Sequence, residues 1–183
     1  MIQYGGGTGT AGQIVVLDSA PLITDCQISN GAKIGIHADK ALPDFRLRNC
    51  LISGNNNGGI YLSRSQATLS GNQVLQNVNG GISISQATTA TLTDNLVEDN
   101  TGAHAVNVAS STVTLTDNTI SKNSGGSGLY LTDSRGKLSG NAISKNRSGN
   151  SAGLFLRSRG YSLTVNGNTI SGNVNTDGHG GVY

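Results

Sequence analysis

The side chains that could carry acid–base or metal chemistry are few and dispersed in this chain of 183 residues. Only ten residues are Asp or Glu and three are His. Elimination chemistry on an acidic polymer needs clustered carboxylates for Ca²⁺ and a nearby Lys or Arg base, and zinc needs His or Cys at ligand spacing. His37 and His104 stand alone, and Cys26 and Cys50 have no His beside them. The sequence therefore predicts no catalytic residues, no metal ligands and no cofactor, and it leans against an enzyme.

Aromatic residues suggest a different kind of chemistry. The chain has only 5 Tyr and 2 Phe. Tyr61 and Tyr183 end matching phrases, Gly58-Gly-Ile-Tyr61 and Gly180-Gly-Val-Tyr183. Exposed rings offer flat apolar faces on which sugars stack, although aromatic strand residues also stack on one another. We predict polysaccharide contact at four of them: Tyr61, Tyr130, Phe155 and Tyr183.

These residues are placed by a phrase that recurs about every 23 residues: an aliphatic residue, two positions, Asn, one position, Val or Ile, two positions, Asn. It reads Leu69 to Asn77, Leu92 to Asn100, Leu115 to Asn123, Leu138 to Asn146 and Val165 to Asn173. Self-similarity at a fixed short period indicates a repeat architecture. The first Asn position and its two earlier counterparts are Cys26, Cys50, Asn72, Asn95, Asn118, Asn141 and Asn168.

Each repeat contains three short segments with period-2 alternation, which predicts strands with one buried face. In one repeat they are Ile60–Leu62, Thr68–Ser70 and Asn72–Val74. The links lack the two-residue turns of hairpins, so each strand pairs with its counterpart one repeat later. The prediction is an all-β protein, a single-stranded parallel β-helix of about seven to eight coils of ~23 residues.

The Leu-x-x-Asn-x-Ile-x-x-Asn and Gly-Gly-Ile-x-Ile phrases resemble the right-handed parallel β-helix repeats of the pectate-lyase-like superfamily. This resemblance implies a secreted or cell-surface protein. The superfamily includes lyases, glycosidases and epimerases as well as tailspikes and surface passengers, so function must come from a site. Ca²⁺ is expected only if the chain is a lyase.

The recurrent Asn residues have a structural explanation. Coils lie ~4.8 Å apart, so like residues stack and Asn amides hydrogen-bond along the stack. Asn also tolerates the left-handed backbone conformation of tight turns. Cys26 and Cys50 extend this ladder, either as small buried thiols or as a disulfide between adjacent coils.

Reading outward positions from coil to coil gives three further expectations. One column runs Val15, Gly35, Tyr61, Ser83, Asn107, Tyr130, Phe155 and Tyr183. A second face carries a Thr-x-Thr grid, centred on Thr91 and Thr114, that resembles the ice-binding face of β-solenoid antifreeze proteins. We also expect Asp99 to form a surface ion pair with Lys122.

The string Asn175-Thr-Asp177-Gly-His179-Gly180 resembles the Asn-Thr-Asp and Gly-His-Gly motifs of polygalacturonase-type glycosidases. In that family the two motifs lie on different coils and are accompanied by an Asp-Asp pair and an Arg-x-Lys motif, which this chain lacks. A six-residue string does not present two carboxylates across one glycosidic bond. We interpret it as a turn.

Bulk properties exclude several classes of protein. The net charge is +2, without a basic stripe or aromatic–basic interleaving, so nucleic acid is not an expected partner. No apolar run approaches ~18 residues, so membrane insertion is not expected. No signal peptide is visible in the first residues, and the phrase at the other end breaks off inside a repeat. We therefore expect residues 1–183 to be one β-helix domain, excised from a longer protein.

We hypothesise a non-catalytic β-solenoid module, a spacer or adhesive with polysaccharide contact. Two alternatives stay open. One is a polysaccharide lyase, hydrolase or epimerase domain with part of its site outside this segment. The other is end-to-end self-association, because a solenoid without polar caps exposes strand edges at both ends.

Overall fold

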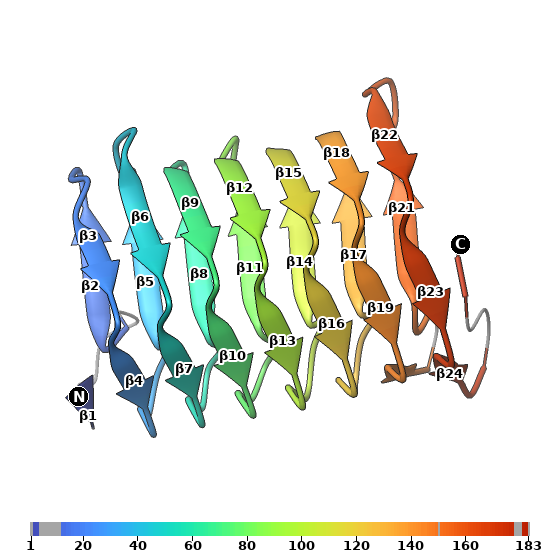
Figure 1. The fold of residues 1–183 in the computed structure, drawn as a ribbon, viewed down its shortest axis with the longest axis horizontal. Helices are drawn as coiled ribbons and strands as arrows, with labels where there is room; N and C mark the ends of the chain where they lie inside the picture. Colours follow the sequence, from blue (N-terminus) through green and yellow to red (C-terminus); the bar gives the residue numbers. More distant parts are fainter. Residues whose placement is uncertain (1, 4–11, 150, 178–180, 183) are drawn as a thin grey trace.

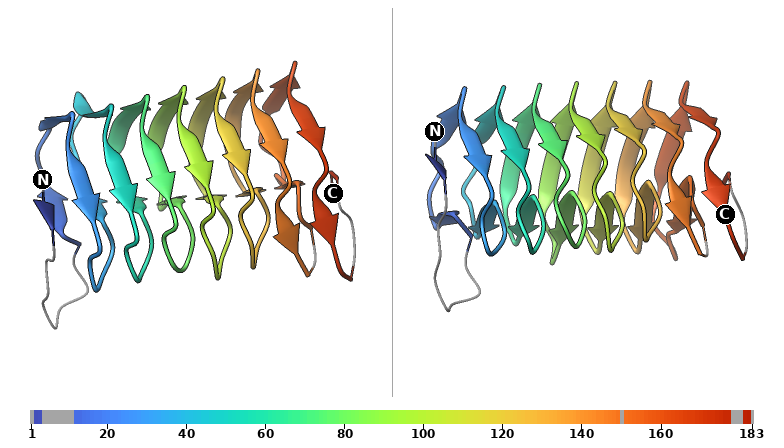
Figure 2. Two further views of the ribbon diagram at one scale, coloured as in Figure 1. Left: turned by 60° about the horizontal axis from the view of Figure 1, so that its bottom comes forward. Right: turned by 90° about the horizontal axis from the view of Figure 1, so that it is seen from below.

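The chain forms a β-solenoid of about seven turns in the computed structural model, which describes residues 2–3, 12–149, 151–177 and 181–182. The coils follow one another along a single axis, with one end of the chain at each end of the stack (Figure 1). Viewed from below, each coil repeats the outline of its neighbour (Figure 2). The predicted all-β parallel coil is confirmed.

Three parallel sheets, each contributing one strand to a coil, run along the solenoid. Sheet 1 contains β2 (Ile14–Leu17), β5 (Ile36–Asp39), β8 (Ile60–Ser63), β11 (Ile82–Ser85), β14 (Val106–Ala109), β17 (Leu129–Thr132) and β21 (Leu154–Arg157). Sheet 2 contains β3 (Leu22–Thr24), β6 (Phe45–Arg48), β9 (Gln66–Ser70), β12 (Thr89–Thr93), β15 (Thr112–Thr116), β18 (Arg135–Ser139) and β22 (Leu163–Asn166). Sheet 3 contains β1 (Ile2–Gln3), β4 (Gln27–Ser29), β7 (Leu51–Ser53), β10 (Gln73–Leu75), β13 (Leu96–Glu98), β16 (Thr119–Ser121), β19 (Ala142–Ser144) and β23 (Thr169–Ser171). A small fourth sheet pairs β20 (Arg147–Ser148) with β24 (Val174–Asn175).

Strand pairing follows the repeat, so equivalent residues lie opposite one another. Val74 of β10 pairs with Ile52 on one side and Val97 on the other. One predicted alignment is wrong: His37, and not Gly35, lies beside Tyr61. Gly35 belongs to the link before β5, two residues ahead of His37, where its N–H donates to the Gly58 carbonyl.

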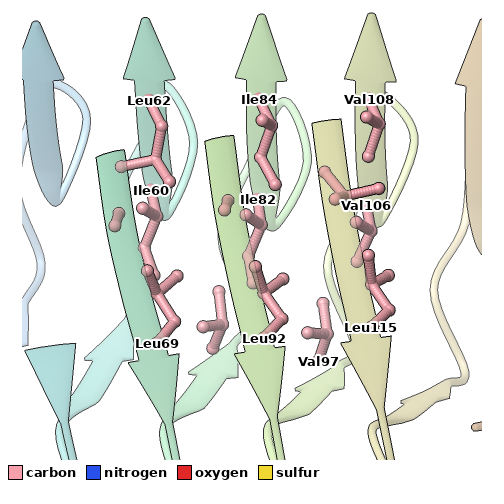
Figure 3. Close-up of a cluster of buried hydrophobic side chains, with 14 of the residues drawn as sticks. Ile60, Leu62, Leu69, Ile82, Ile84, Leu92, Val97, Val106, Val108 and Leu115 are labelled. Atoms are coloured by element: carbon pink, nitrogen blue, oxygen red, sulfur yellow. The ribbon is translucent and has the colours of Figure 1, made fainter. Parts of the chain in front are cut away.

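The core is a set of aliphatic columns that run along the axis. Sheet 1 contributes two inward residues per strand, such as Ile60 and Leu62 (Figure 3). Most strands of sheet 2 also contribute two, such as Ala67 and Leu69, and the strands of sheet 3 contribute one each. Leu69, Leu92 and Leu115 repeat at the same place in successive coils, each almost completely buried. Because side chains of the same shape stack from coil to coil, each coil is filled in the same way. The inward residues of the alternating strands therefore form a continuous apolar interior.

The predicted Asn ladder fills the corner between sheets 2 and 3. Asn118 donates its backbone N–H to Asn141 Oδ1 at 3.0 Å and its Nδ2 to the same oxygen at 2.9 Å. Its Nδ2 also lies 2.9 Å from the Leu92 carbonyl and 3.0 Å from the Thr116 carbonyl. A single buried amide thus satisfies backbone groups of its own coil and of the preceding coil, and it also donates to the side chain of the next ladder Asn.

The other two corners have ladders of their own. The second Asn of the phrase makes the same bonds between sheets 3 and 1; its members are Asn55, Asn77, Asn100, Asn123, Asn146 and Asn173. Between sheets 1 and 2, hydroxyl oxygens accept the backbone N–H of the preceding coil, as when Ser134 Oγ accepts from Ser111 at 3.0 Å. From β8 to β19, each corner therefore carries a buried polar side chain that bonds backbone groups of the neighbouring coil.

The left-handed backbone conformation expected of the ladder Asn residues occurs one position earlier. Asp94 and Asp117 both have a φ of 54°, and each precedes a ladder Asn that is not in this conformation. Gly71 and Gly140 hold the same place in other coils, with φ of 64° and 67°. The preceding residue turns the chain, and this leaves the Asn side chain free to point into the interior.

Cys26 and Cys50 continue the ladder as free thiols. The Cys26 N–H lies 3.4 Å from Cys50 Sγ, and the Cys50 N–H donates to Asn72 Oδ1 at 3.0 Å. Burial raises the pKa of the Cys50 thiol. Cys50 therefore acts as a neutral acceptor where later coils use an amide.

The surface ion pair predicted for Lys122 has a different partner. Lys122 Nζ lies 3.0 Å from Glu98 Oε1, and Glu98 also accepts from the Ser121 hydroxyl at 2.8 Å. Glu98 faces outward on β13, whereas Asp99 occupies the left-handed corner position. In the part of the chain that the structure describes, no helix is long and apolar enough to cross a membrane.

We predict that Asn118→Ala destabilises the protein by about 3 kcal/mol, because the Asn95 N–H and two backbone carbonyls lose buried partners. Guanidinium chloride unfolding followed by circular dichroism measures the change. Asn56→Ala, at an exposed position, is the control and should stay within about 0.5 kcal/mol. Equal unfolding midpoints for the two variants would show that the ladder is not a main source of stability.

Candidate functional site

The outward column of sheet 1 collects most of the rings in the described part of the chain. Tyr130 and Phe155 lie in register on β17 and β21, and their rings stack with centroids 4.5 Å apart. His37 and Tyr61 lie in register on β5 and β8 and meet edge to face at 5.2 Å. Ser83 and Asn107 occupy the two coils between these pairs. The aromatic column is therefore divided into two groups by two small polar residues.

His104 joins the second group although it is not on a strand. Its ring stacks on Tyr130 with centroids 4.0 Å apart. It precedes β14 at the place that Gly58 and Gly80 hold in the two preceding coils, because the link from β13 to β14 is one residue longer than the link from β10 to β11. Sequence reasoning gave His104 no role; the replaced glycine was the signal that could have found it.

The gap between the two aromatic groups is a hollow of about 340 Å³, which we call the sheet-1 hollow. Tyr61 and His104 both line it, and the coils that carry them are two steps apart, or ~10 Å at ~4.8 Å per coil. Its complete lining is Ile34, Asn57, Gly58, Ile60, Tyr61, Asn79, Gly80, Gly81, Ile82, Ser83, Ala103, His104 and Asn107.

Glycine keeps the sheet-1 hollow open. Gly80 has a φ of +99°, and a Cβ at this position would lie 2.6 Å from the His104 carbonyl oxygen. A side chain is therefore excluded here by the backbone conformation and by close contact. In the next coil the position equivalent to Gly58 and Gly80 is occupied by His104, and its ring lines the hollow.

The sheet-1 hollow is uncharged. None of its lining residues is Asp, Glu, Lys or Arg. Burial lowers the pKa of His104, and its Nδ1 accepts the Ser127 N–H at 2.9 Å, so the ring is neutral at pH 7. Tyr61 is held in place by the Ser85 hydroxyl, 3.2 Å from its phenol oxygen. Asn and Ser side chains supply donors and acceptors, and the rings supply apolar surface.

The four predicted contact residues fall into separate places. Tyr61 and His104 line the sheet-1 hollow, whereas Tyr130 stacks on His104 and Phe155 on Tyr130, on the coils that follow. Tyr183 lies outside the described residues. Because Tyr130 stacks between two rings, its faces are covered and only its edge is presented outward.

Other motifs from the sequence lie away from this hollow. The Asp177 N–H donates to Asn175 Oδ1 and the Thr176 hydroxyl to Asp177, each at 3.2 Å, as in a local turn; Gly178, His179 and Gly180 lie outside the described residues. The Thr-x-Thr grid is in register on sheet 2, where Thr91 pairs with Thr114. Among the described residues no group of three or more His, Cys, Asp or Glu is placed to hold a metal ion.

Comparison with known proteins gives one match. A family model described as the right-handed β-helix region matches residues 5–120 and again residues 101–183. No curated protein matches the chain, and no solved structure matches it.

We predict that the buried, neutral His104 makes stability fall as the pH drops below its unfolded pKa of about 6.5. Its folded pKa is lowered, so the unfolded state takes up the proton first and is favoured as the pH falls. Melting temperatures measured at pH 7 and pH 5 should show this loss. His104→Asn keeps an acceptor near the Ser127 N–H and should reduce the loss, whereas His37→Asn, the matched control, should keep it. Equal losses in His104→Asn and the parent would contradict the assignment.

Proposed function

The chain belongs to the right-handed β-helix family, and we propose that it is a non-catalytic solenoid module of a secreted or cell-surface protein that contacts an uncharged polysaccharide. The observation that carries this proposal is the sheet-1 hollow, an uncharged space between Tyr61 and His104 with amides and a hydroxyl between them. The secreted or cell-surface setting follows from the resemblance of the repeat phrases.

The volume of the sheet-1 hollow, about 340 Å³, suits a sugar unit. Two rings of its lining, those of Tyr61 and His104, offer apolar faces on which a sugar can stack, at roughly 4 Å in van der Waals contact. Asn57, Asn79 and Asn107 side chains lie around this space and can exchange hydrogen bonds with sugar hydroxyls. A linear glycan would lie across the coils, along the axis of the solenoid.

The absence of charge among the lining residues favours a neutral glycan over a polyuronate. An anionic chain would leave its carboxylates without cationic partners in a partly desolvated place. The same lining supplies no acid–base pair for hydrolysis or elimination. The lyase, hydrolase or epimerase alternative would therefore need a site built from other parts of the protein.

The rest of the fold supports a spacer or adhesive role. Ladders at all three corners and a continuous apolar interior hold the coils in one register, so the module presents its outward columns on a rigid surface. Rigid presentation lowers the entropy that a binding surface loses when it meets an extended ligand.

Binding of neutral oligosaccharides tests the site. On a glycan array and in titration calorimetry we expect Tyr61→Ala to weaken binding about tenfold, since a stacked ring contributes on the order of 1.5 kcal/mol. The double variant Tyr130→Ala with Phe155→Ala removes the support of His104 and should also weaken it. Leu42→Ala, an exposed apolar change between β5 and β6, is the control and should bind as the parent does.

Two results would overturn the proposal. One is retained affinity in both the Tyr61 variant and the double variant. The other is turnover: incubation with uronic-acid polymers and Ca²⁺ should give no unsaturated product, and clear formation of it would favour the enzyme alternative.

We also propose self-association as a second candidate function, favoured by the exposed apolar residues of the end coils. Leu17 is 56% and Leu22 60% exposed in the first complete coil, and Val165 is 45% and Val174 51% exposed in the last. The outer edges of β2 and β22 have no pairing strand among the described residues. Stacking of two copies would pair such edges and cover these side chains.

Light scattering over a range of concentrations should then show growing particle size. Leu17→Ser with Leu22→Ser should shift this growth to higher concentration, because less apolar surface is buried on stacking. A control on a corner, Asn56→Ala, should leave it unchanged. A monomer at all concentrations would exclude self-association.

A further inference from the structure

A second hollow lies at the corner between sheets 1 and 2, on a different side of the solenoid from the sheet-1 hollow. It has a volume of about 250 Å³, and we call it the corner hollow. Its lining residues are Ala87, Thr89, Ser110, Ser111, Thr112, Asp133, Arg135 and Tyr161. They come from four of the coils, so the corner hollow extends along the axis.

Unequal corner lengths create this hollow. Two residues separate β14 from β15 and β17 from β18. Three separate β11 from β12, and five, Ser158 to Ser162, separate β21 from β22. The two longer corners project beyond the two shorter ones between them. Insertions in single repeats of a solenoid commonly build the features of a binding face.

The added residues in the last coil bring Tyr161 to the edge of the hollow. Ser158 still holds the hydroxyl-ladder position, because its Oγ accepts the Ser134 N–H at 3.2 Å. The insertion therefore falls after the ladder, and Gly160, with a φ of 73°, turns the chain there. Tyr161 is 49% exposed and lines the hollow with its remaining surface.

Two charged side chains, those of Asp133 and Arg135, line the corner hollow, and they do not form an ion pair with each other. Arg135 donates its Nε to Thr112 Oγ1 at 3.1 Å. The half-buried Asp133 carboxylate has no ion pair and no hydrogen bond among the described residues. Its two oxygens and the remaining guanidinium donors of Arg135 are thus available beside the hydroxyls of Thr89 and Ser110.

We propose that the corner hollow binds a single uncharged sugar unit. A carboxylate accepts hydrogen bonds from two neighbouring sugar hydroxyls, a guanidinium donates to others, and the tyrosine ring covers the apolar face of the sugar. The volume is below that of a drug-sized pocket and suits one ring. This proposal does not depend on polysaccharide binding at the sheet-1 hollow.

The charges decide between ligand classes. An anion would be attracted by Arg135 but repelled by the neighbouring Asp133 carboxylate. A cation would be attracted by Asp133 but repelled by Arg135. A divalent metal ion would find only one carboxylate here, fewer ligands than such ions require. A neutral polyhydroxyl ligand uses both charged groups.

Titration with methyl glycosides of glucose, galactose and mannose, followed by amide NMR shifts, tests the proposal. At least one glycoside should shift the amides of Ser110, Thr112 and Asp133. Asp133→Asn should weaken this binding at least tenfold, since it removes a charged acceptor, and Tyr161→Ala about tenfold.

The chain offers a matched control for the aspartate. Asp117 also has a left-handed φ, 54° against 46° for Asp133, and lies at another corner, so Asp117→Asn should bind like the parent. Melting temperatures of all variants report folding, and Asn suits the left-handed conformation of both positions.

The outcomes separate the two sites. Tyr61→Ala should keep glycoside binding here, and Asp133→Asn should keep polysaccharide binding at the sheet-1 hollow. Lack of binding by every glycoside, unchanged affinity in Asp133→Asn and Tyr161→Ala, or loss of glycoside binding in Tyr61→Ala alone would overturn the corner-hollow proposal.

Discussion

The rest of the structure depends on the hydrogen bond that each ladder Asn makes with the next coil. A corner bends the chain from one sheet to the next, and at such a bend the backbone N–H cannot simply continue the strand ladder. The side-chain oxygen of Asn141 accepts that N–H from Asn118, and the amide nitrogen of Asn118 satisfies carbonyls of Leu92 and Thr116. Because an unpaired buried backbone group is costly, this arrangement fixes both the place of the bend and the register of adjoining coils.

Fixed register turns the outer surface into columns, and a departure from the repeat then becomes a feature in space. Gly58 and Gly80 have no side chain, and His104 holds the equivalent position in the next coil. The sheet-1 hollow lies beside His104, over the two glycines. Where two short corners lie between longer ones, the corner hollow results. In both places the regular part of the solenoid supplies rigidity, and the irregular residues supply shape.

The sequence was sufficient for the repeat, the three strands of each coil and the first Asn ladder, because each depends on a local pattern that stacking repeats. It was not sufficient for residues in the links. His37, and not Gly35, faces Tyr61, because Gly35 lies in the link and not on the strand. The place of His104 in the column of Gly58 and Gly80 could not be seen from the repeat, because insertions in successive coils compensate. The coil that starts at Asn100 has an extra residue before β14, whereas the coil that starts at Asn77 has its extra residue before β12. Both ladder steps are 23 residues, so the period alone conceals where each insertion lies.

The last coil shows why corners can vary while the ladders stay constant. Its step from Asn141 to Asn168 is 27 residues, yet the two hydrogen bonds between them, 3.0 and 2.8 Å, match those of the 23-residue coils. The extra residues lie in the link before β21 and in the corner that carries Tyr161. Lengthening a surface loop adds only a small closure entropy, whereas moving a ladder Asn would leave several buried groups unpaired. Variation in the shape of the surface therefore costs least between the ladders, and both hollows lie there.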